Sequence, residues 1–173
     1  MYYVLIPVYQ AKAWLDACLD SVFAQTEQNF HIILVDDGST DGSGTLCDDW
    51  AKKDPRVEVV HQANSGPYGA RRAAIARCLK EAEGEDWAVF LDADDSLKPK
   101  ALETIGSKAG DCDMVFIGED QVWEGKVLRP FPADKAYVGT VEDKRRLYKI
   151  VFQDGWYNPL WKKAVKVRLL PKD

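Results

Sequence analysis

The sequence predicts a single α/β domain: a mostly parallel β-sheet with helices on both faces, followed by a C-terminal hairpin and helix. Short apolar runs, of the kind buried in parallel sheets, alternate along the chain with segments whose apolar residues recur at helical spacing. Turn and capping residues separate the two kinds of segment. The chain, at 173 residues, is long enough to bury one hydrophobic core. Such alternation is typical of βαβ units, whose strands run parallel.

Three strand–helix units are predicted in the first half of the chain. Their strands are short apolar runs at residues 3–8, 32–35 and 57–60. The first helix carries apolar residues at helical spacing, namely Leu15, Cys18, Leu19, Val22 and Phe23. Thr40 or Asp41 can cap the second helix, whose apolar face is formed by Leu46, Cys47, Trp50 and Ala51. The turn at 64–67 places Pro67 in the first turn of a third helix, which reaches about Ala82.

Two more strands and a different pattern follow in the second half. The strands are expected at 87–91 and 113–117, with a helix from Pro99 to about Ala109 between them. Beyond residue 117, the segment 121–128 is broken by a Glu-Gly pair and is typical of a hairpin. A capping box at Thr140 would open a last helix, which ends near Phe152.

The composition narrows the classes of function. A net charge of −5 and a pI of about 5.1 argue against a nucleic-acid partner. The chain begins directly in a strand pattern without a visible signal peptide, and no apolar stretch approaches the roughly 18 residues of a membrane span. We therefore expect a cytoplasmic protein with no transmembrane segment. The four cysteines have no zinc spacing, so we expect free, structural thiols.

Carboxylates follow two of the predicted strands. Asp36 and Asp37 come after the second strand, and Asp92, Asp94 and Asp95 come after the fourth. In open parallel sheets, ligands bind beyond the carboxyl ends of the strands. Three neighbouring acids repel one another, and Mg²⁺ or Mn²⁺ would relieve that repulsion while also binding diphosphate oxygens. The sequence therefore offers a metal site after the fourth strand, with a solvated, helix-capping turn as the alternative.

Other residues have both a structural and a functional interpretation. Asp37 would recognise a base or ribose, or else shape a turn. Arg71 and Arg72 would offset phosphate charge, or else form a solvated helix face. His31 and His61 have no spaced ligand partners, and we expect both to be structural. We expect either a place in the core or a platform for the acceptor from three aromatic residues, Trp156, Tyr157 and Trp161.

Four motifs occur in order along the chain. They are Ile6-Pro7-Val8-Tyr9, then Val35-Asp36-Asp37-Gly38-Ser39-Thr40-Asp41, then Asn64-x-Gly66 with Ala70-Arg71, and finally Phe90-Leu91-Asp92-Ala93-Asp94-Asp95. Together, over roughly residues 2–118, they resemble the family-2 inverting glycosyltransferases of the GT-A fold. The run Asn158-Pro159-Leu160-Trp161-Lys162 resembles a weaker motif of the same family.

The resemblance implies a donor site for a UDP- or GDP-sugar and a transfer to a glycan or lipid-linked acceptor. It implies that the sugar nucleotide is bound by Pro7, Tyr9, Asp37, Gly66, Arg71 and Asp92, and that Asp94 or Asp95 binds Mn²⁺ or Mg²⁺. The family inverts by single displacement, and the metal stabilises the departing nucleoside diphosphate. Polysaccharide assembly at the inner face of the membrane is the setting that the resemblance implies.

This sequence departs from the family pattern at three places. Gln10 and Arg72 stand where the family usually has Asn. The family's catalytic base, commonly within a Glu-Asp pair, follows the Trp-Lys motif by some tens of residues, whereas this sequence stops at Asp173. We therefore expect residues 1–118 to form the nucleotide-sugar-binding region and 119–173 to begin a truncated acceptor-side region. Such a chain would bind the donor yet transfer poorly, with its base beyond Asp173.

Three other classes of protein share some of these features. A Rossmann dehydrogenase would carry a glycine-rich turn after the first strand, where this chain has Pro7-Val8-Tyr9-Gln10. An aspartate-nucleophile phosphohydrolase would carry its Asp-x-Asp after the first strand rather than the fourth. A non-catalytic nucleotide- or carbohydrate-binding module is the strongest alternative, because the expected base is absent.

Overall fold

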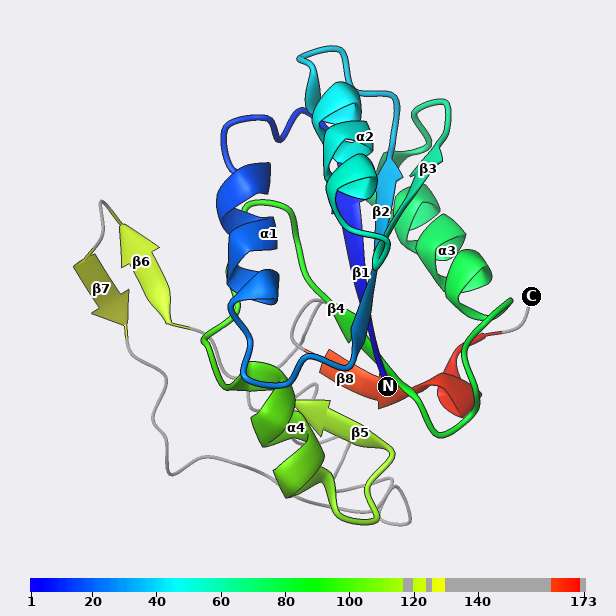
Figure 1. Cartoon of the computed structure of the whole chain (residues 1–173), viewed down its shortest axis with the longest axis vertical. Helices are drawn as coiled ribbons and strands as arrows, with labels where there is room; N and C mark the ends of the chain where they lie inside the picture. Colours follow the sequence, from blue (N-terminus) through cyan, green and yellow to red (C-terminus); the bar gives the residue numbers. More distant parts are fainter. Residues whose placement is uncertain (117–119, 124–125, 130–162, 172–173) are drawn as a thin grey trace, which may run out of the picture.

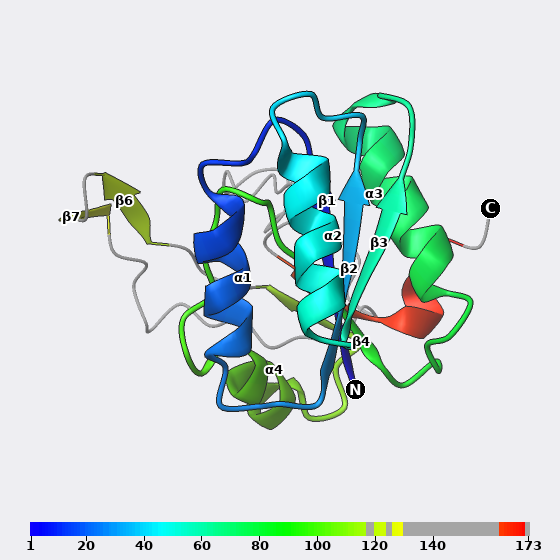
Figure 2. The same ribbon diagram turned by 45° about the horizontal axis from the view of Figure 1, so that its top comes forward.

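The computed structural model describes residues 1–116, 120–123, 126–129 and 163–171 (Figure 1). These residues form a six-stranded sheet in the order β3-β2-β1-β4-β8-β5 and a separate two-stranded sheet, β6-β7. The strands are β1 (Tyr2–Val8), β2 (Phe30–Asp36), β3 (Val57–His61), β4 (Trp87–Phe90), β5 (Met114–Phe116), β6 (Gln121–Trp123), β7 (Lys126–Arg129) and β8 (Lys163–Lys166). The β6-β7 pair lies out to the side of α1 in both ribbon views (Figures 1 and 2).

The large sheet is mostly parallel, as the sequence predicted. β1 pairs in parallel with β2 and β4, and β2 pairs in parallel with β3. β8 is antiparallel to both of its neighbours, β4 and β5. A strand from the end of the chain thus lies between two strands of the first part.

Both faces of the sheet are buried, which explains why the strands are continuous apolar runs. Along β1, Val4, Ile6 and Val8 belong to one core cluster, and Tyr3 and Leu5 belong to the other. Successive side chains of a strand point to opposite faces, so an apolar residue is needed at every position.

The helices divide between the two faces (Figures 1 and 2). They are α1 (Leu15–Phe23), α2 (Ser43–Lys53), α3 (Gly66–Cys78), α4 (Ala101–Ala109) and a short 3-10 helix, η3 (Val167–Leu169). Apolar residues of α1, α2 and α4 pack into the first cluster, whereas those of α3 and η3 pack into the second. The chain therefore forms an α/β/α sandwich of three layers.

The sheet opens between β1 and β4. β1 pairs with β2 up to Val8 and Asp36, but it pairs with β4 only up to Leu5 and Phe90. Proline has no N–H for a strand ladder, and Pro7 lies in the part of β1 that extends past β4. The strand order also reverses at β1, and ligands of open α/β sheets bind at such a switch point.

Most predicted elements are confirmed, with shifted ends. The second helix begins at Ser43 after Gly42, not after a Thr40 or Asp41 cap. Asp41 accepts hydrogen bonds from the backbone N–H of Ser43 (2.9 Å) and of Lys12 (3.1 Å), so it shapes the turn before the helix. The third helix ends at Cys78 and continues to Ala82 only as turns.

The later elements agree in part. The hairpin predicted at 121–128 is present as β6 and β7, whereas β8 was not predicted. The helix expected from Thr140 to Phe152 lies outside the described residues. All four cysteines are free, and three of them are buried. The boundary at residue 118 stays a prediction.

Candidate functional site

A cavity of about 380 Å³ lies where the sheet opens, at the carboxyl ends of the parallel strands. Four segments line it: the end of β1 with the loop after it, the loop after β2, the approach to α3 with its first turns, and the loop after β4. The lining residues are Pro7, Val8, Tyr9, Ala11, Trp14, Asp37, Asn64, Gly66, Pro67, Ala70, Arg71, Asp92, Ala93 and Asp94. The cavity therefore combines apolar walls with a few converging polar groups, as small-molecule sites do.

Asp37 ties the loop after β2 to the loop before α3. Its Oδ1 accepts hydrogen bonds from Gln62 Nε2 (2.6 Å), the Ser65 backbone N–H (2.9 Å) and Ser65 Oγ (3.1 Å). Its Oδ2 accepts one from the backbone N–H of Gly66 (2.9 Å). Gly66 has a φ of 78°, a conformation that favours glycine. Asp37 is only 2% exposed. Its hydrogen bonds to the loop before α3 hold one wall of the cavity in place.

These hydrogen bonds also fix the charge of Asp37. Burial alone would raise the pKa of its carboxyl, but hydrogen bonds from Gln62, Ser65 and Gly66 outweigh burial and lower the pKa. The group is therefore a carboxylate at neutral pH. Its contribution to stability is present above the unfolded-state pKa and is lost as the pH falls through the lowered folded-state pKa.

The neighbouring Asp36 makes its contacts with other residues. Its Oδ1 accepts the backbone N–H of Ser39 (3.0 Å), and its Oδ2 is 3.0 Å from His61 Nδ1. The other ring nitrogen, Nε2, is 2.9 Å from Oδ1 of Asp48 in α2. In its protonated form the imidazole donates from both ring nitrogens, which suits two carboxylate acceptors. The hydrogen bonds to Asp36 and Asp48 accordingly raise the pKa of His61, against the effect of burial.

Gln10 joins the loop after β1 to the loop after β2. Its Oε1 accepts the backbone N–H groups of Thr40 (2.8 Å) and Asp41 (3.1 Å), and its Nε2 donates to Thr40 Oγ1 (3.0 Å). Its φ of 51° is the one positive value of a non-glycine residue in the described part of the chain. Such a conformation costs about 1 kcal/mol or more and persists where its surroundings hold it. The amide of Gln10 thus fixes the backbone next to the cavity-lining Tyr9.

The loop after β4 gathers three carboxylates. One oxygen from each of Asp92, Asp94 and Asp95 lies within 4.8 Å of the others. Arg71 of α3 donates to Asp92 Oδ1 at 2.6 Å, while Asp94 and Asp95 are exposed. Several closely spaced carboxylate oxygens, their charge offset in part by one guanidinium, suit Mg²⁺ or Mn²⁺. The side chains present therefore fit the metal that the resemblance implies.

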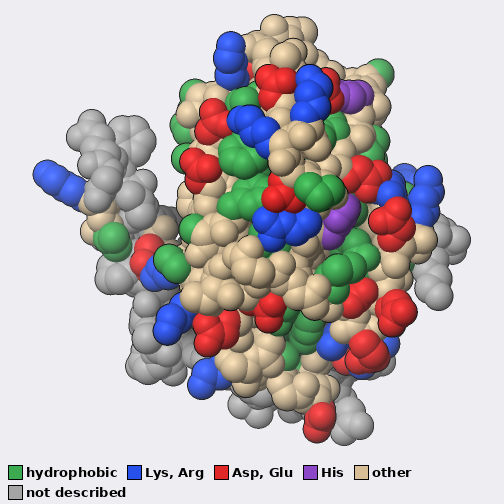
Figure 3. Space-filling model, in the orientation of Figure 1, with side chains coloured by type: hydrophobic (Ala, Val, Ile, Leu, Met, Phe, Trp, Pro, Cys, Tyr) green, Lys and Arg blue, Asp and Glu red, His purple; other side chains and the backbone are tan. Residues whose placement is uncertain are grey.

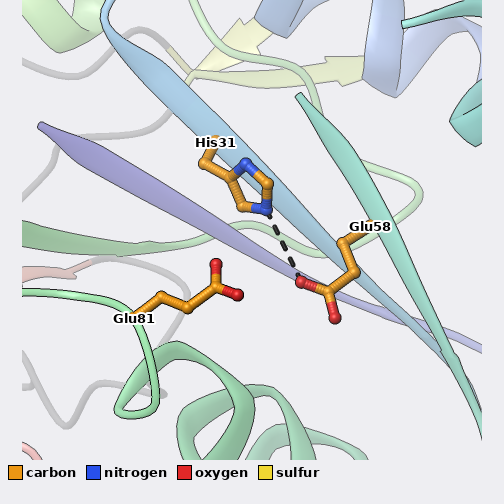
Figure 4. Close-up of side chains that lie close together, drawn as sticks. All are labelled: His31, Glu58 and Glu81. Atoms are coloured by element: carbon orange, nitrogen blue, oxygen red, sulfur yellow. Dashed lines mark ion pairs between the residues drawn. The ribbon is translucent and has the colours of Figure 1, made fainter. Parts of the chain in front are cut away.

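A second group of possible metal ligands lies elsewhere in the fold (Figure 4). His31, Glu58 and Glu81 also come within 4.8 Å of one another, and His31 Nε2 is 3.6 Å from Glu58 Oε2. His31 and Glu58 lie near the starts of β2 and β3. This is the amino end of the parallel strands, whereas the cavity is at their carboxyl end. Arg77 of α3 donates to Glu58 and, at 2.5 Å, to Glu81. Its guanidinium already pairs with both carboxylates and offsets part of their charge, as in a structural ion-pair network.

The predicted site residues are brought together at one place. Those that line the cavity are Pro7, Tyr9, Asp37, Gly66, Arg71, Asp92 and Asp94. Asp95 adjoins it through the acidic loop, and Arg72 is not among the lining residues. Sequence reasoning missed Gln62, Ser65 and Trp14, whose only signal was their place in loops at the carboxyl edge of the sheet. The predicted platform residues Trp156, Tyr157 and Trp161 and the 158–162 motif lie outside the described residues.

A protein-family model matches almost the whole chain. The model of the family described as Glycosyl transferase family 2 matches residues 3–167, which include every strand of the large sheet. The chain belongs to glycosyltransferase family 2. The glycosyltransferase GlyG of Streptococcus pneumoniae serotype 4 is 40% identical over 116 residues, which cover 66% of this chain and 37% of GlyG. The uncharacterized glycosyltransferase YibD of Escherichia coli K12 is 33% identical over 136 residues, covering 76% of this chain and 38% of YibD.

Solved structures show the same fold. S. aureus TarS 1–349 in complex with UDP-GlcNAc superposes with a TM-score of 0.72 at 24% identity, over 98% of this chain and 46% of that one. The mannosyltransferase PcManGT of Pyrobaculum calidifontis, in complex with GDP-Man and Mn²⁺, has a TM-score of 0.51 at 21% identity, over 68% of this chain and 35% of its own. The fold of this family-2 chain is therefore GT-A. The chain spans less than half the length of the relatives named here.

The helices and the surface charge of this family-2 chain also bear on what it binds. None of the helices in the described ranges combines the length and apolar character that crossing a membrane requires. Acidic and basic side chains are interspersed on the face seen in Figure 3, without a large area of one sign. On this face, a charged ligand would therefore meet local groups of charge rather than a broad field of one sign.

Proposed function

We propose that this chain supplies the donor-binding site of a glycosyltransferase that moves a sugar from a nucleoside-diphosphate sugar to a glycan or lipid-linked acceptor, with inversion and with Mn²⁺ or Mg²⁺. One observation carries the proposal. Asp37, Arg71 and the acidic loop come from three separate segments, yet they meet at one cavity at the switch point of the sheet. A sugar nucleotide needs such a series of contacts, for its nucleoside, its diphosphate and its sugar.

The nucleoside would lie against the wall held by Asp37. The loop that Asp37 anchors supplies Asn64 and Gly66 to the cavity, and the strand end opposite supplies Pro7 and Tyr9. A planar base would fit between such walls, because apolar side chains stand there beside a few polar groups. Asp92, held by Arg71 at 2.6 Å, would then face the ribose.

The diphosphate would lie at the acidic loop. Asp94 and Asp95 would hold the metal, and a bound divalent cation supplies Lewis-acid stabilisation of the negative charge on the leaving diphosphate. Arg71 keeps Asp92 oriented and adds a fixed positive charge near the phosphates. The complexes of TarS with UDP-GlcNAc and of PcManGT with GDP-Man and Mn²⁺ support UDP and GDP as the two nucleotides to consider.

Inversion would proceed by single displacement. The acceptor hydroxyl oxygen attacks the anomeric carbon as the bond to the diphosphate breaks, while a carboxylate base takes the hydroxyl proton. We assign no base among the described residues. Polysaccharide assembly at the cytoplasmic face of a membrane is the setting we propose for the whole protein.

Thermal unfolding with nucleotides tests the proposal. UDP or GDP should raise the melting temperature more with Mn²⁺ or Mg²⁺ than with EDTA, because a ligand that binds only the folded state stabilises it. ATP and CMP serve as controls for general nucleotide binding. Equal shifts with metal and with EDTA would contradict a metal-assisted donor site. Nucleotide binding without release of UDP or GDP from any sugar nucleotide would instead favour a binding module.

A further inference from the structure

Trp14 exposes a large aromatic surface at the cavity. It lines the cavity and is 54% exposed, whereas Trp87 is 6% exposed and Trp50 donates its indole N–H to Asp16 at 2.8 Å. Leaving an indole in water forgoes the stabilisation that burying a large apolar side chain provides. An aromatic ring that stays exposed inside a ligand cavity is typical of a contact surface for that ligand.

The backbone fixes where this ring stands. The Trp14 N–H donates to the carbonyl of Ala11 (3.0 Å), and its own carbonyl accepts the N–H of Cys18 (3.0 Å) in the first turn of α1. Ala11 is in turn held by Ser43, whose Oγ accepts its N–H at 2.9 Å. The base of the Trp14 side chain is therefore anchored both to α1 and to the start of α2.

Trp14 lies on the side of the cavity that adjoins the acidic loop. Cys18, one helical turn further along α1, places its thiol 3.6 Å from the carbonyl of Asp92. Leu15 and Cys18 of α1 share a core cluster with Leu91 and Ala93, whereas Ala70 of α3 belongs to the other cluster. Trp14, directly before α1, is therefore on the same face of the sheet as the acidic loop.

We propose that Trp14 is a stacking platform for a pyranose ring. This inference rests on the proposed function, because it takes the acidic loop to be the diphosphate end. A pyranose has one face rich in C–H groups, and these are attracted to the electron-rich face of an indole. The ring could belong to the donor sugar or to the acceptor, since both must meet beside the diphosphate. The same stacking chemistry serves either source.

The indole N–H resonance of Trp14 in the nuclear magnetic resonance spectrum tests the proposal on the unaltered protein. The resonance is assigned by its disappearance in Trp14→Phe. With Mn²⁺ replaced by Mg²⁺ to avoid paramagnetic broadening, the titrants are UDP against UDP-GlcNAc and UDP-glucose, GDP against GDP-mannose, and a set of hexose and N-acetylhexosamine disaccharides. A shift with sugar nucleotides beyond that with the bare nucleotide identifies the donor sugar. A shift with a disaccharide identifies an acceptor. No shift with any of them overturns the proposal.

Affinities provide a second, independent measurement. For a donor platform, Trp14→Ala should lower the preference for a sugar nucleotide over its bare nucleotide by about tenfold, and Trp14→Phe should retain part of it. Tyr68→Ala is a matched control, because Tyr68 is an aromatic residue that is 74% exposed and is not among the lining residues. If neither UDP nor GDP binds the unaltered protein, the proposed function fails, and the disaccharide titration alone decides for or against the platform.

Discussion

The acidic loop Asp92–Asp95 and the group of His31, Glu58 and Glu81 each bring three side chains of types that can bind a metal within 4.8 Å of one another. They differ in what surrounds them. The acidic loop follows β4 and borders the cavity, and Arg71 contacts its Asp92. In the other group, Arg77 contacts both carboxylates at the far edge of the sheet. A metal there would have to displace a guanidinium that already holds its ligands.

Distance alone therefore does not identify a metal site in this fold. What separates the two groups is how many carboxylates the chain's own arginine contacts, together with access from a cavity. A guanidinium that bridges two carboxylates supplies the positive charge that a metal would otherwise supply. The predictions below test this contrast.

The largest expected effect concerns the acidic loop. The double substitution Asp94→Ala and Asp95→Ala should abolish the extra thermal stabilisation that UDP or GDP gains from Mn²⁺, because the remaining carboxylate is already paired with Arg71. The matched control is Glu58→Gln with Glu81→Gln, which removes the charges of the other group and should leave the metal-dependent increment intact. An increment that survives in the first variant, or vanishes in the second, would reverse the assignment of the two groups.

The next prediction distinguishes the part of the cavity held by Asp37, where we place the nucleoside, from the acidic loop, where we place the metal. Asp37→Ala removes the acceptor for Gln62, Ser65 and Gly66, so nucleotide binding should weaken by roughly 1–3 kcal/mol. Binding of inorganic pyrophosphate with Mn²⁺, which needs only the acidic loop, should change little. Titration calorimetry with both ligands provides the measurement. Equal losses for UDP and pyrophosphate would show that the two ends of the cavity are not independent.

How far the sequence predicted this site depends on whether a signal is local. Asp37 and Asp92–Asp95 could be placed because each follows directly on an apolar strand, and strand ends of a parallel sheet gather at one edge. The two groups of possible ligands show the limit of that argument. Nothing in the spacing of His31, Glu58 and Glu81 joins them, since they come from β2, from β3 and from the turns after α3.

Contacts between distant segments were the part that could not be predicted. β8 pairs with β4 and β5 across a long stretch of sequence, and its short run of Ala164 and Val165 between lysines is a weak strand signal on its own. The hydrogen bond from Gln62 to Asp37 joins two loops, and no pattern within either loop specifies it. Tertiary packing decides such pairs, so they become visible only in the folded chain.

A smaller effect is expected at the other group of ligands. Arg77→Met keeps the stem of the side chain but removes the charge shared by Glu58 and Glu81, and stability should fall by about 1 kcal/mol, as for partly exposed ion pairs. The freed carboxylates, together with His31, should then bind Zn²⁺ weakly and recover part of the loss. Urea unfolding with and without Zn²⁺ measures both effects. Arg72→Met, at an exposed arginine of the same helix, is the control; Zn²⁺ stabilisation that is equal in both variants would contradict the account.

The smallest expected effect is a dependence on pH, because a rise in pH removes the charge of the His61 imidazolium without removing the side chain. His61 is bracketed by Asp36 and Asp48 much as Glu58 and Glu81 bracket Arg77, but its charge can titrate. Because these hydrogen bonds raise the folded-state pKa of His61 above its ordinary value, the stability that the imidazolium provides is fully present below the unfolded-state pKa of about 6.5. It is lost as the pH rises through the raised folded-state pKa. The melting temperature of the unaltered chain should therefore exceed that of His61→Gln most at mildly acidic pH, and the difference should shrink as the pH rises. A difference that is constant or grows with pH would mean that His61 contributes to stability as a neutral side chain.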